Sequence, residues 1–337
     1  MKRVLAARQD NNGDVLLMGP AVRAIASCAD VTLLCGPRGA AAARALPGVN
    51  NVIVCEAQWI DAEPGAVDYD RTIAFINDIK ARQFDEAILF TSFHQSPLPL
   101  ALLLRMAGVP RIGAISVDYP GSLLDVRHRV ENDIHEVERA LSLARSMGYE
   151  LPPGDSARLA MRGLPACCCV PFSSYIVVHP GATVPARAWF PSRNAELVDR
   201  LCARGVNVVV TGGPDESALT GYVAGDLALD LGGKTSFEEF AAIVRDADAV
   251  VCGNTATAHI AAAVGTPVVS IFPPTIPAVR FRPWMVAHAL LGDQSIECGG
   301  CRARVCPIPG QPCLDVVKVD DVLRALDLIA SLPAEVA

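Results

Sequence analysis

The sequence predicts an α/β protein built from two successive Rossmann-like halves, each with a parallel β-sheet. Apolar runs of four to seven residues, bounded by Gly, Pro or Asn, alternate with longer segments of helical period. This alternation stops near residues 151–154 and 163–171, where turn residues cluster, and then begins again. A chain of 337 residues also corresponds to about two domains. We therefore expect domains at residues 1–165 and 166–337, facing each other across an interdomain cleft.

The expected elements follow the same alternation in both halves. In the first half, strands are expected at residues 4–7, 31–35, 52–55, 87–90 and 111–115, and helices at 15–26, 69–81 and 98–106. In the second half, strands are expected at 175–179, 206–211, 227–231, 249–252 and 267–272, and helices at 192–204, 236–247 and 255–264. Ser236 and Glu239 have the spacing of a capping box. A final helix at 319–332 could pack on either half. Ligands of such sheets bind beyond the carboxyl ends of the strands, so functional residues are expected just after them.

Composition excludes several classes of protein. With 51% hydrophobic and 19% charged residues, the chain is neither largely disordered nor a coiled coil. Its net charge of -7 argues against binding nucleic acid through the overall field. The N-terminus lacks an apolar run of signal-peptide length, which favours a cytoplasmic protein. The longest segment without charged residues, 249–279, contains glycines and four prolines, so it predicts a strand, a helix and a strand rather than a membrane span.

The turn after the first expected strand offers a carboxylate at a helix start. Its single glycine, Gly13, disfavours a dinucleotide site, which needs several glycines. Asp14 follows directly, where the helix dipole favours the ionised form, and such a carboxylate suits a general base. The alternative is that Asp14 only stabilises the helix end.

Turns in the second half could hold a nucleotide. The small-residue turn that reaches Thr183 is followed by Arg187, a combination that suits a phosphate, although an ordinary strand-to-helix loop would look similar. After the next strand, Gly212 and Glu216 open another helix, where Glu216 could cap the helix or accept hydrogen bonds from ribose.

The most informative turn precedes a helix of mainly Ala and Ile. Asn254, Thr255 and Ala256 lead from a buried strand into this helix, whose first N–H groups could bind an anion. His259 lies on the same helix, where packing is the commoner role of a histidine.

Twelve cysteines in a reducing compartment are expected to be buried hydrophobes or metal ligands rather than disulfides. Cys298, Cys301, Cys306 and Cys313 lie within 16 residues of a Gly/Pro-rich segment, and four thiolates could close a structural Zn or Fe site. Free thiols or a disulfide are the alternatives there. The run at 167–169 is expected to be buried linker packing, and the single cysteines are expected in the cores: Cys28, Cys35, Cys55, Cys202 and Cys252.

Taken in order, these turns resemble the glycosyltransferase family 9 heptosyltransferases of lipopolysaccharide biosynthesis, which have the GT-B fold. The resemblance covers nearly the whole chain, through residues 10–22, 93–110, 135–139, 179–191, 232–236, 253–259 and 265–269. It implies transfer of a heptose from ADP-heptose, with inversion and without a catalytic metal, to a hydroxyl of the lipopolysaccharide inner core or a related glycan. The acceptor would be a lipid-linked saccharide at the inner membrane face.

The resemblance also implies roles for particular residues. Asp14 falls where the family keeps its catalytic base, and Arg187 where the family has a cation that neutralises the leaving diphosphate. The donor would be bound by Gly13, Thr183, Gly212, Glu216, Asn254, Thr255, Ala256 and His259. The chain departs from the family where Asn-Asp-Thr-Gly is usual, because Asn254 replaces an acid and Ala256 replaces a glycine. That departure leaves the identity of the donor sugar open.

The acceptor is expected on the first half. Candidate contacts are Arg105, Arg111, Arg127 and Arg129, each of which could instead be a solvated surface charge. Association with a membrane would then be local and weak, about 1 kcal/mol for each well-placed basic residue. Two other functions are a nucleotide-sugar epimerase of similar fold and a non-catalytic nucleotide-sugar-binding protein.

Overall fold

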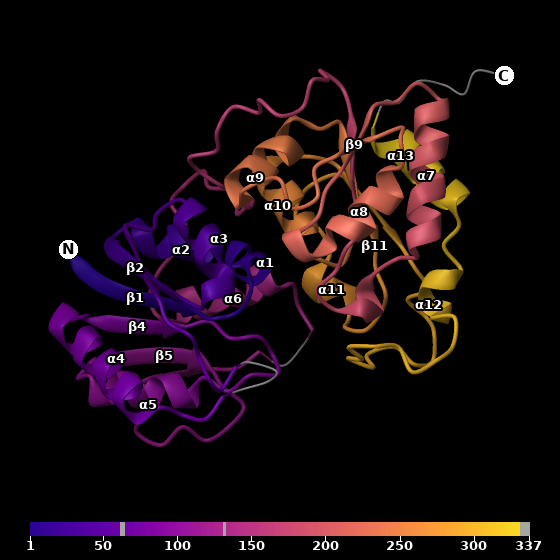
Figure 1. Cartoon of the computed structure of the whole chain (residues 1–337). Helices are drawn as coiled ribbons and strands as arrows, with labels where there is room; N and C mark the ends of the chain where they lie inside the picture. Colours follow the sequence, from indigo (N-terminus) through magenta and orange to yellow (C-terminus); the bar gives the residue numbers. More distant parts are fainter. Residues whose placement is uncertain (61–64, 131–132, 331–337) are drawn as a thin grey trace. The chain divides into compact units, whose positions relative to one another are not determined.

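Two parallel β-sheets, one in each of two units, organise the chain (Figure 1). The structure is a computed structural model and describes residues 1–60, 65–130 and 133–330. Unit 1 comprises Met1–Arg162 and unit 2 comprises Gly163–Ala337. The expected boundary, between residues 165 and 166, lies close to this division.

Unit 1 contains a six-stranded sheet in the order β3-β2-β1-β4-β5-β6, with every pair parallel. Its strands are β1 (Lys2–Arg8), β2 (Ala29–Cys35), β3 (Asn51–Val54), β4 (Glu86–Leu89), β5 (Arg111–Ile115) and β6 (Val126–His128). Its helices are α1 (Asn12–Leu17), α2 (Gly19–Ala26), α3 (Ala40–Ala45), α4 (Tyr69–Arg82), α5 (Leu98–Met106) and α6 (Glu136–Ser146), with the short 3-10 turn η1 (Pro37–Gly39).

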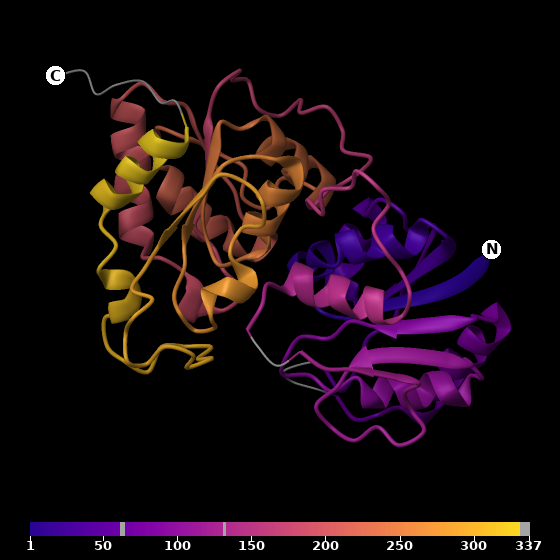
Figure 2. The same cartoon turned by 180° about the vertical axis from the view of Figure 1, so that it is seen from behind.

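The central strand β1 is covered on both faces. Val4, Leu5 and Ala6 are fully buried, as expected of a central strand in a parallel sheet. Helices α4 and α5 cover the face that carries Leu5, through Ile79 and Leu104 among others. Helices α1, α2, α3 and α6 pack together on the other face (Figures 1 and 2).

Unit 2 repeats the architecture, with strand order β12-β11-β10-β7-β8-β9 and all pairs parallel. Its strands are β7 (Ile176–His179), β8 (Val208–Val210), β9 (Leu229–Asp230), β10 (Ala249–Gly253), β11 (Val268–Ile271) and β12 (His288–Leu291). Its helices are α7 (Pro191–Ala203), α8 (Ser217–Ala224), α9 (Phe237–Asp246), α10 (Ala256–Val264), α11 (Ala278–Phe281), α12 (Pro312–Asp315) and α13 (Val319–Ile329), with 3-10 turns η2 (Pro185–Arg187) and η3 (Pro214–Glu216).

The expected α/β fold, with two parallel sheets, is confirmed, and the expected strands and helices are all present with small shifts of their ends. One predicted helix, at residues 15–26, is two helices, α1 and α2. Pro20 has no N–H to donate to the carbonyl of Leu16, so the first helix cannot continue through it. The final helix α13 packs on α7 and on the sheet of unit 2. Part of its expected range, from residue 331 onward, lies outside the described residues.

Two strands, β6 and β12, were not expected. Both lie at sheet edges and all their residues are only half-buried; β6 has no apolar run, and that of β12 is limited to its last three residues. The predicted capping box of α9 is confirmed, because Ser236 Oγ accepts from Glu239 N at 3.2 Å and Glu239 Oε2 accepts from Ser236 N at 2.8 Å.

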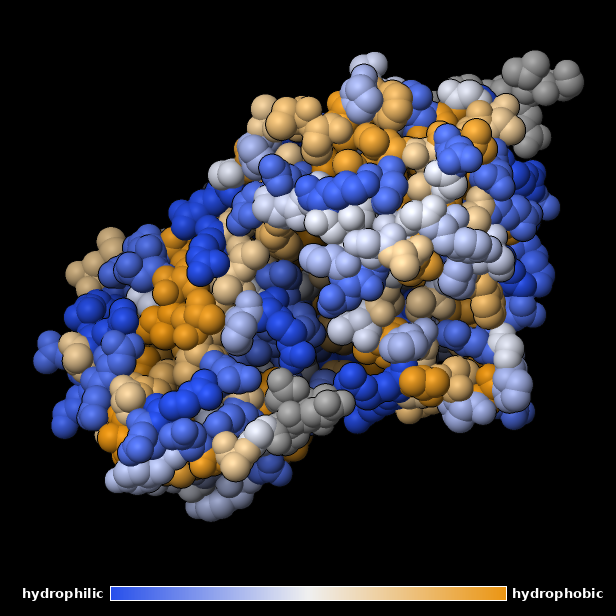
Figure 3. Space-filling view, viewed as in Figure 1, coloured by the Kyte–Doolittle hydropathy of each residue, from blue (hydrophilic) through white to orange (hydrophobic). Residues whose placement is uncertain are grey.

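Hydropathy varies from residue to residue over the surface drawn in Figure 3. On the face drawn in Figure 3, hydrophilic and hydrophobic residues are interspersed over both units. Within the described ranges, no helix has the length and apolar character needed to cross a membrane.

Two expectations about cysteines are wrong. Cys28 is exposed rather than in the core, and in the run at 167–169, which was expected to be buried, Cys168 and Cys169 are exposed and Cys167 is half-buried. The linker segment around this run has no helix or strand that could cover it. Cys35 and Cys252 are buried as expected, while Cys55 and Cys202 are half-buried.

Candidate active site

A buried arginine at the end of β1 holds two carboxylates. The Nε of Arg8 lies 2.7 Å from Asp10 Oδ2, and its Nη2 lies 3.1 Å from Asp14 Oδ1. The Arg8 side chain is only 4% exposed and that of Asp14 is 20% exposed. Arg8 Nη2 also donates to Ser92 Oγ at 2.9 Å. Asp14, in the first turn of α1, is therefore held in one orientation and remains partly accessible to solvent.

Helix α6 adds two more charges to this cluster. Glu136 Oε2 lies 3.8 Å from Arg8 Nη1 and 3.7 Å from Arg139 Nη1, and the Glu136 side chain is 2% exposed. The segment at 135–139, which carries part of the family resemblance, thus joins the same cluster as Asp14. Three carboxylates and two guanidinium groups meet there, all of them in unit 1.

The surroundings of Asp14 favour its protonated form. The pKa of Asp14 is raised to about 6: burial is the largest cause, the nearby Asp10 and Glu136 also raise it, and Arg8 opposes them. The start of α1 alone would favour the ionised form, but burial outweighs it here. A carboxyl group with such a pKa can exchange a proton near neutral pH, as a general base must.

A pocket that the sequence did not predict lies at the ends of β1 and β4, on the face of the sheet that α5 covers. Ala7, Trp59, Phe90 and Leu100 contribute to its lining, and its volume is about 250 Å³ including the open mouth. Two polar atoms in its wall, Gln9 Oε1 and Thr91 Oγ1, are buried and have no hydrogen-bond partner among the described residues.

The amide orientation of Gln9 follows from its contact, since Nε2 donates to Cys55 O at 3.3 Å. The Oε1 atom can therefore accept a hydrogen bond from a molecule in the pocket. The segment that carries Thr91 also reaches the acidic cluster, because Gln95 Nε2 donates to Asp10 Oδ1. The pocket and the cluster are thus joined by one short loop.

Three of the four candidate acceptor arginines are bonded within unit 1. Arg105 donates to the carbonyl oxygens of Val109 and Pro110 and pairs with Asp125. Arg111 Nη1 lies 3.0 Å from Glu86 Oε1. Arg127 donates to the carbonyl oxygens of two residues after β5, Ser116 and Val117. Arg129 is exposed. Contact of these four residues with an acceptor stays a prediction.

In unit 2, the turns after β7 and β8 meet around Glu216. Its Oε2 accepts from Gly213 N at 2.8 Å, so Glu216 caps the start of η3, one of the two expected roles. A Cβ on Gly181 would lie 2.0 Å from Glu216 Oε1, and one on Gly212 would lie 2.6 Å from Thr220 Cγ2. A side chain at Gly212 would clash with Thr220, and one at Gly181 would displace the Glu216 carboxylate. The expected ribose contact of Glu216 stays a prediction.

The turn that carries Arg187 lies against the end of β10. A Cβ on Gly253 would be 2.7 Å from Arg187 O, so glycine is needed for this close approach. The next residue, Asn254, is 5% exposed, and its Nδ2 has no partner among the described residues. Thr255 is the N-cap residue of α10 but makes no side-chain cap bond. Polar groups without partners thus surround the start of α10, as a nucleotide site requires.

The remaining predicted donor residues differ in their surroundings. Thr183 is exposed in the turn after β7, and Ala256 is the first residue of α10. His259 is 4% exposed, with its ring 6.4 Å from that of Phe281, as in the packing role considered for it. Gly13 is buried in α1 beside Asp14, in unit 1.

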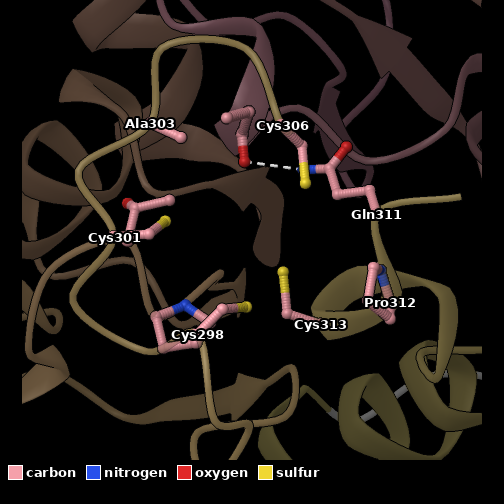
Figure 4. A pocket seen from close by; sticks show the side chains of 10 residues that line it. Cys298, Cys301, Ala303, Cys306, Gln311, Pro312 and Cys313 are labelled. Carbon is pink, nitrogen blue, oxygen red and sulfur yellow. Dashed lines mark hydrogen bonds between the residues drawn. The ribbon is translucent and has the colours of Figure 1, made fainter. Parts of the chain in front are cut away.

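The four late cysteines line one small, open-sided pocket in unit 2. Cys298, Cys301 and Cys306 precede α12 and Cys313 lies on it. Figure 4 shows their sulfur atoms turned toward the space that they enclose. Burial raises the pKa of the Cys313 thiol, and the other three cysteines raise it further. Across the ranges that the structure describes, however, no group of three or more His, Cys, Asp or Glu side chains is placed to hold a metal ion.

The raised pKa of Asp14 has a consequence for stability. The folded state binds this proton more tightly than the unfolded chain, whose Asp has a pKa near 3.8, so the free energy of unfolding should fall as pH rises from about 4 to about 6. Asp14→Asn, which mimics the neutral form, should therefore stabilise the protein by about 1–3 kcal/mol near pH 7.5 and little near pH 4, as measured by denaturant unfolding. Carboxyl NMR should show Asp14 titrating near pH 6, and at lower pH in Asp10→Asn. The control is Asp78→Asn, on the exposed side of α4, which should change neither the pH dependence of the unfolding free energy nor the titration of Asp14. An Asp14 that titrates at the pH of an ordinary aspartate would contradict the assignment.

Comparisons with known proteins identify the family to which the chain belongs. The sequence profile of "Glycosyltransferase family 9 (heptosyltransferase)" matches residues 72–311. Lipopolysaccharide heptosyltransferase 3 of Escherichia coli is 34% identical over 119 residues, which are 33% of this chain and 34% of that protein. The match thus spans about a third of that relative's length.

Solved structures resemble the whole chain. E. coli heptosyltransferase WaaC, solved with ADP-2-deoxy-2-fluoro heptose, has a TM-score of 0.74 at 21% identity, covering 97% of this chain and 100% of WaaC. The iron-containing dodecameric glycosyltransferase TibC from enterotoxigenic E. coli H10407 has a TM-score of 0.55 at 16% identity, covering 97% of this chain and 75% of TibC. The two parallel sheets therefore match those of GT-B heptosyltransferases, and because the family profile covers most of its length, the chain belongs to glycosyltransferase family 9, the heptosyltransferases.

Proposed function

We propose that the protein transfers a heptose from ADP-heptose to a hydroxyl of the lipopolysaccharide inner core or a related glycan, with inversion at the anomeric carbon. The observation that carries this proposal is the Asp14 carboxylate, which is held by Arg8 and whose pKa is raised to about 6, chiefly by burial. A non-catalytic binding protein has no need of such a group, and membership in family 9 favours a transferase over an epimerase.

In the proposed reaction, Asp14 accepts the proton of the acceptor hydroxyl as that oxygen attacks the anomeric carbon. The new glycosidic C–O bond forms while the bond from that carbon to the diphosphate oxygen breaks on the opposite face. ADP leaves with the bonding electron pair, and the proton remains on Asp14 until solvent removes it. General acid–base catalysis of this kind contributes about 10²–10⁴-fold to the rate.

Unit 2 supplies the groups that suit the donor. Arg187 would neutralise the charge that develops on the leaving diphosphate, and the first N–H groups of α10 would bind its oxygens. Glu216 would accept hydrogen bonds from the ribose, and Thr183, Gly212, Thr255, Ala256 and His259 would complete the donor site. The side-chain amide of Asn254, which lacks a partner, would face the donor in place of the acid usual in the family.

Unit 1 supplies the groups that suit the acceptor. The pocket beside Gln9 and Thr91 joins apolar walls to polar atoms without partners, a combination typical of small-molecule sites. Arg129, exposed near the end of β6, could contact an acidic, lipid-linked acceptor, and so could Arg105, Arg111 and Arg127 if their present bonds exchange. Such contacts would bring the protein to the inner membrane face.

The cysteine pocket would hold a structural ion. Its four thiols suit Zn or Fe, both of which thiolates bind well. With four protein ligands the ion would have no open position, so it would stabilise the loop and take no part in the transfer. The iron content reported for TibC makes iron the first ion to test.

The proposed transfer is tested by replacing its catalytic base, Asp14. Asp14→Asn should lower kcat about 10²–10⁴-fold while the affinity for ADP changes less than about twofold, because the base contacts the acceptor oxygen and not the nucleotide. Product formation is measured by mass spectrometry with a deacylated inner-core oligosaccharide, and ADP affinity by calorimetry. Asp78→Asn is the matched control. Full activity of Asp14→Asn would remove this residue from the mechanism, and turnover of ADP-heptose without an acceptor would favour the epimerase.

Donor binding is tested on its cation. A thermal-shift screen should show a larger rise in Tm with ADP than with UDP or GDP, since only a ligand of the folded state raises Tm. Arg187→Gln should weaken ADP binding by about 1.5–3 kcal/mol, and Arg187→Lys should restore part of it. Arg280→Gln, on α11, serves as the control. Equal ADP affinity in wild type and Arg187→Gln would place the diphosphate elsewhere.

The metal proposal is tested by analysis of the purified protein. Plasma mass spectrometry should find about one equivalent of Fe or Zn per chain, lost in Cys298→Ser and kept in Cys28→Ser, whose thiol is outside the cluster. Removal of the ion should lower Tm, because a folded site binds the ion more tightly than the unfolded chain. Protein produced with both metals supplied that contains neither would end this proposal.

A further inference from the structure

The turn that carries Arg187 is held in place by the cysteine segment. We call residues 298–313 the thiol loop. The N–H of Ala186, in η2, donates to the carbonyl oxygen of Arg304 at 2.9 Å, and its carbonyl oxygen accepts from Gln311 Nε2 at 2.6 Å. The second of these bonds is drawn in Figure 4. Both backbone polar groups of the residue before Arg187 are thus bonded to the thiol loop.

On its other side, the same turn meets the sheet. The carbonyl oxygen of Arg187 approaches Gly253 so closely that a side chain at Gly253 is excluded. The turn therefore lies between the end of β10 and the thiol loop. On one side the turn contacts β10, a central strand of the sheet, and on the other side it contacts the thiol loop. A shift of the thiol loop would therefore change the contacts of the turn on that side only.

The thiol loop is irregular and is packed into the core of unit 2 only at its C-terminal end, through Cys313. From the end of β12 at Leu291 to the start of α12 at Pro312 there is no helix or strand in the described structure, and most of the loop's residues are exposed. Besides its bonds to Ala186, the loop is anchored by Gly300 N donating to Pro274 O at 2.7 Å, by Arg302 N donating to Thr275 O at 3.0 Å and, at its C-terminal end, by Asp293 N donating to Cys313 O at 3.0 Å.

Gln311 itself has an unfavourable backbone. Its φ is 46°, in the left-handed region that residues other than Gly and Asn rarely adopt. Such a conformation persists only where the surroundings fix it. Here Gln311 N donates to Ile308 O at 3.2 Å, the Gln311 carbonyl oxygen accepts from Leu314 N at 3.0 Å, and the side-chain amide donates to Ala186 O. The amide that holds η2 is two residues from Cys313, a thiol of the pocket.

The pocket wall connects these features. Ala186 and Gln311 line the same cavity as Cys298, Cys301, Cys306 and Cys313. A group that draws the four thiols together therefore also fixes the side chain that binds Ala186.

We propose that the thiol loop is a positioning element for Arg187: closure of its four cysteines by one thiophilic metal ion holds Gln311 and Arg304 against Ala186 and thereby orients the guanidinium toward the donor diphosphate. This inference rests on the proposed function, because it assigns the loop a part in donor binding. It makes Gln311 a positioning residue, one that acts through Arg187 and does not touch the substrate.

The test is a double-mutant cycle between Gln311 and Arg187, read as ADP affinity by calorimetry. Gln311→Gly removes the amide and tolerates the positive φ, so it should fold, and it should weaken ADP binding about tenfold through the lost orientation of Arg187. In an Arg187→Gln background the same change should have almost no effect, since the residue it positions is gone. A metal-binding change, Cys298→Ser with Cys301→Ser, should weaken ADP binding similarly.

Gln294→Ala is the matched control. Its Nε2 donates to the carbonyl oxygen of Phe272 at 2.7 Å, a bond of the same kind in the same unit that does not touch η2, so ADP affinity should be unchanged. Unchanged ADP affinity in Gln311→Gly, or effects that add fully with Arg187→Gln, would overturn the inference while leaving the proposed function intact. A wild-type protein that binds no ADP would instead overturn the proposed function, and this inference with it.

Discussion

The parallel course of every strand is the constraint on which the candidate sites depend. In a parallel sheet all carboxyl ends meet at one edge, so the turns after the strands come together although they are far apart in the sequence. In unit 1 this edge brings Arg8, the last residue of β1, and Asp10, just after it, to Ser92, which follows β4. In unit 2 it brings the turns after β7 and β8 together at Glu216, and sets the Arg187 turn against the end of β10.

Much of the fold could be predicted because both sheets are buried. Central strands such as β1 and β10 are continuous apolar runs, and the helices between them keep a clear period. The edge strand β6 lacks that signal because two of its three residues are Arg127 and His128, and the apolar part of β12 is only three residues long. The break between α1 and α2 could have been predicted from Pro20. The helical period continues through this residue, but a proline has no N–H to form the backbone hydrogen bond.

The site was predictable only where a residue has a local signal. Asp14 and Glu216 stand at helix starts after strands, so the sequence points to them. Arg8 belongs to a buried central strand, and its partners Ser92 and Glu136 are far along the chain, which no local pattern reports. A charged residue at the end of an otherwise apolar strand, two residues before Asp10, was nevertheless a usable signal. Gln311 had none, because its importance comes from a bond to Ala186 across the fold.

Opposing demands on Asp14 explain why its surroundings contain so many charges. A general base must be oriented, which an ion pair with Arg8 achieves, but a lone arginine at 3.1 Å would also lower the carboxyl pKa and make the group a weak base. Asp10 shares the same guanidinium at 2.7 Å, and Glu136 lies 3.8 Å from it, so part of the positive charge is already compensated. Arg8 can therefore fix the geometry of Asp14 without holding it ionised, and burial then sets the pKa. The cluster separates orientation from proton affinity, which a single ion pair would couple.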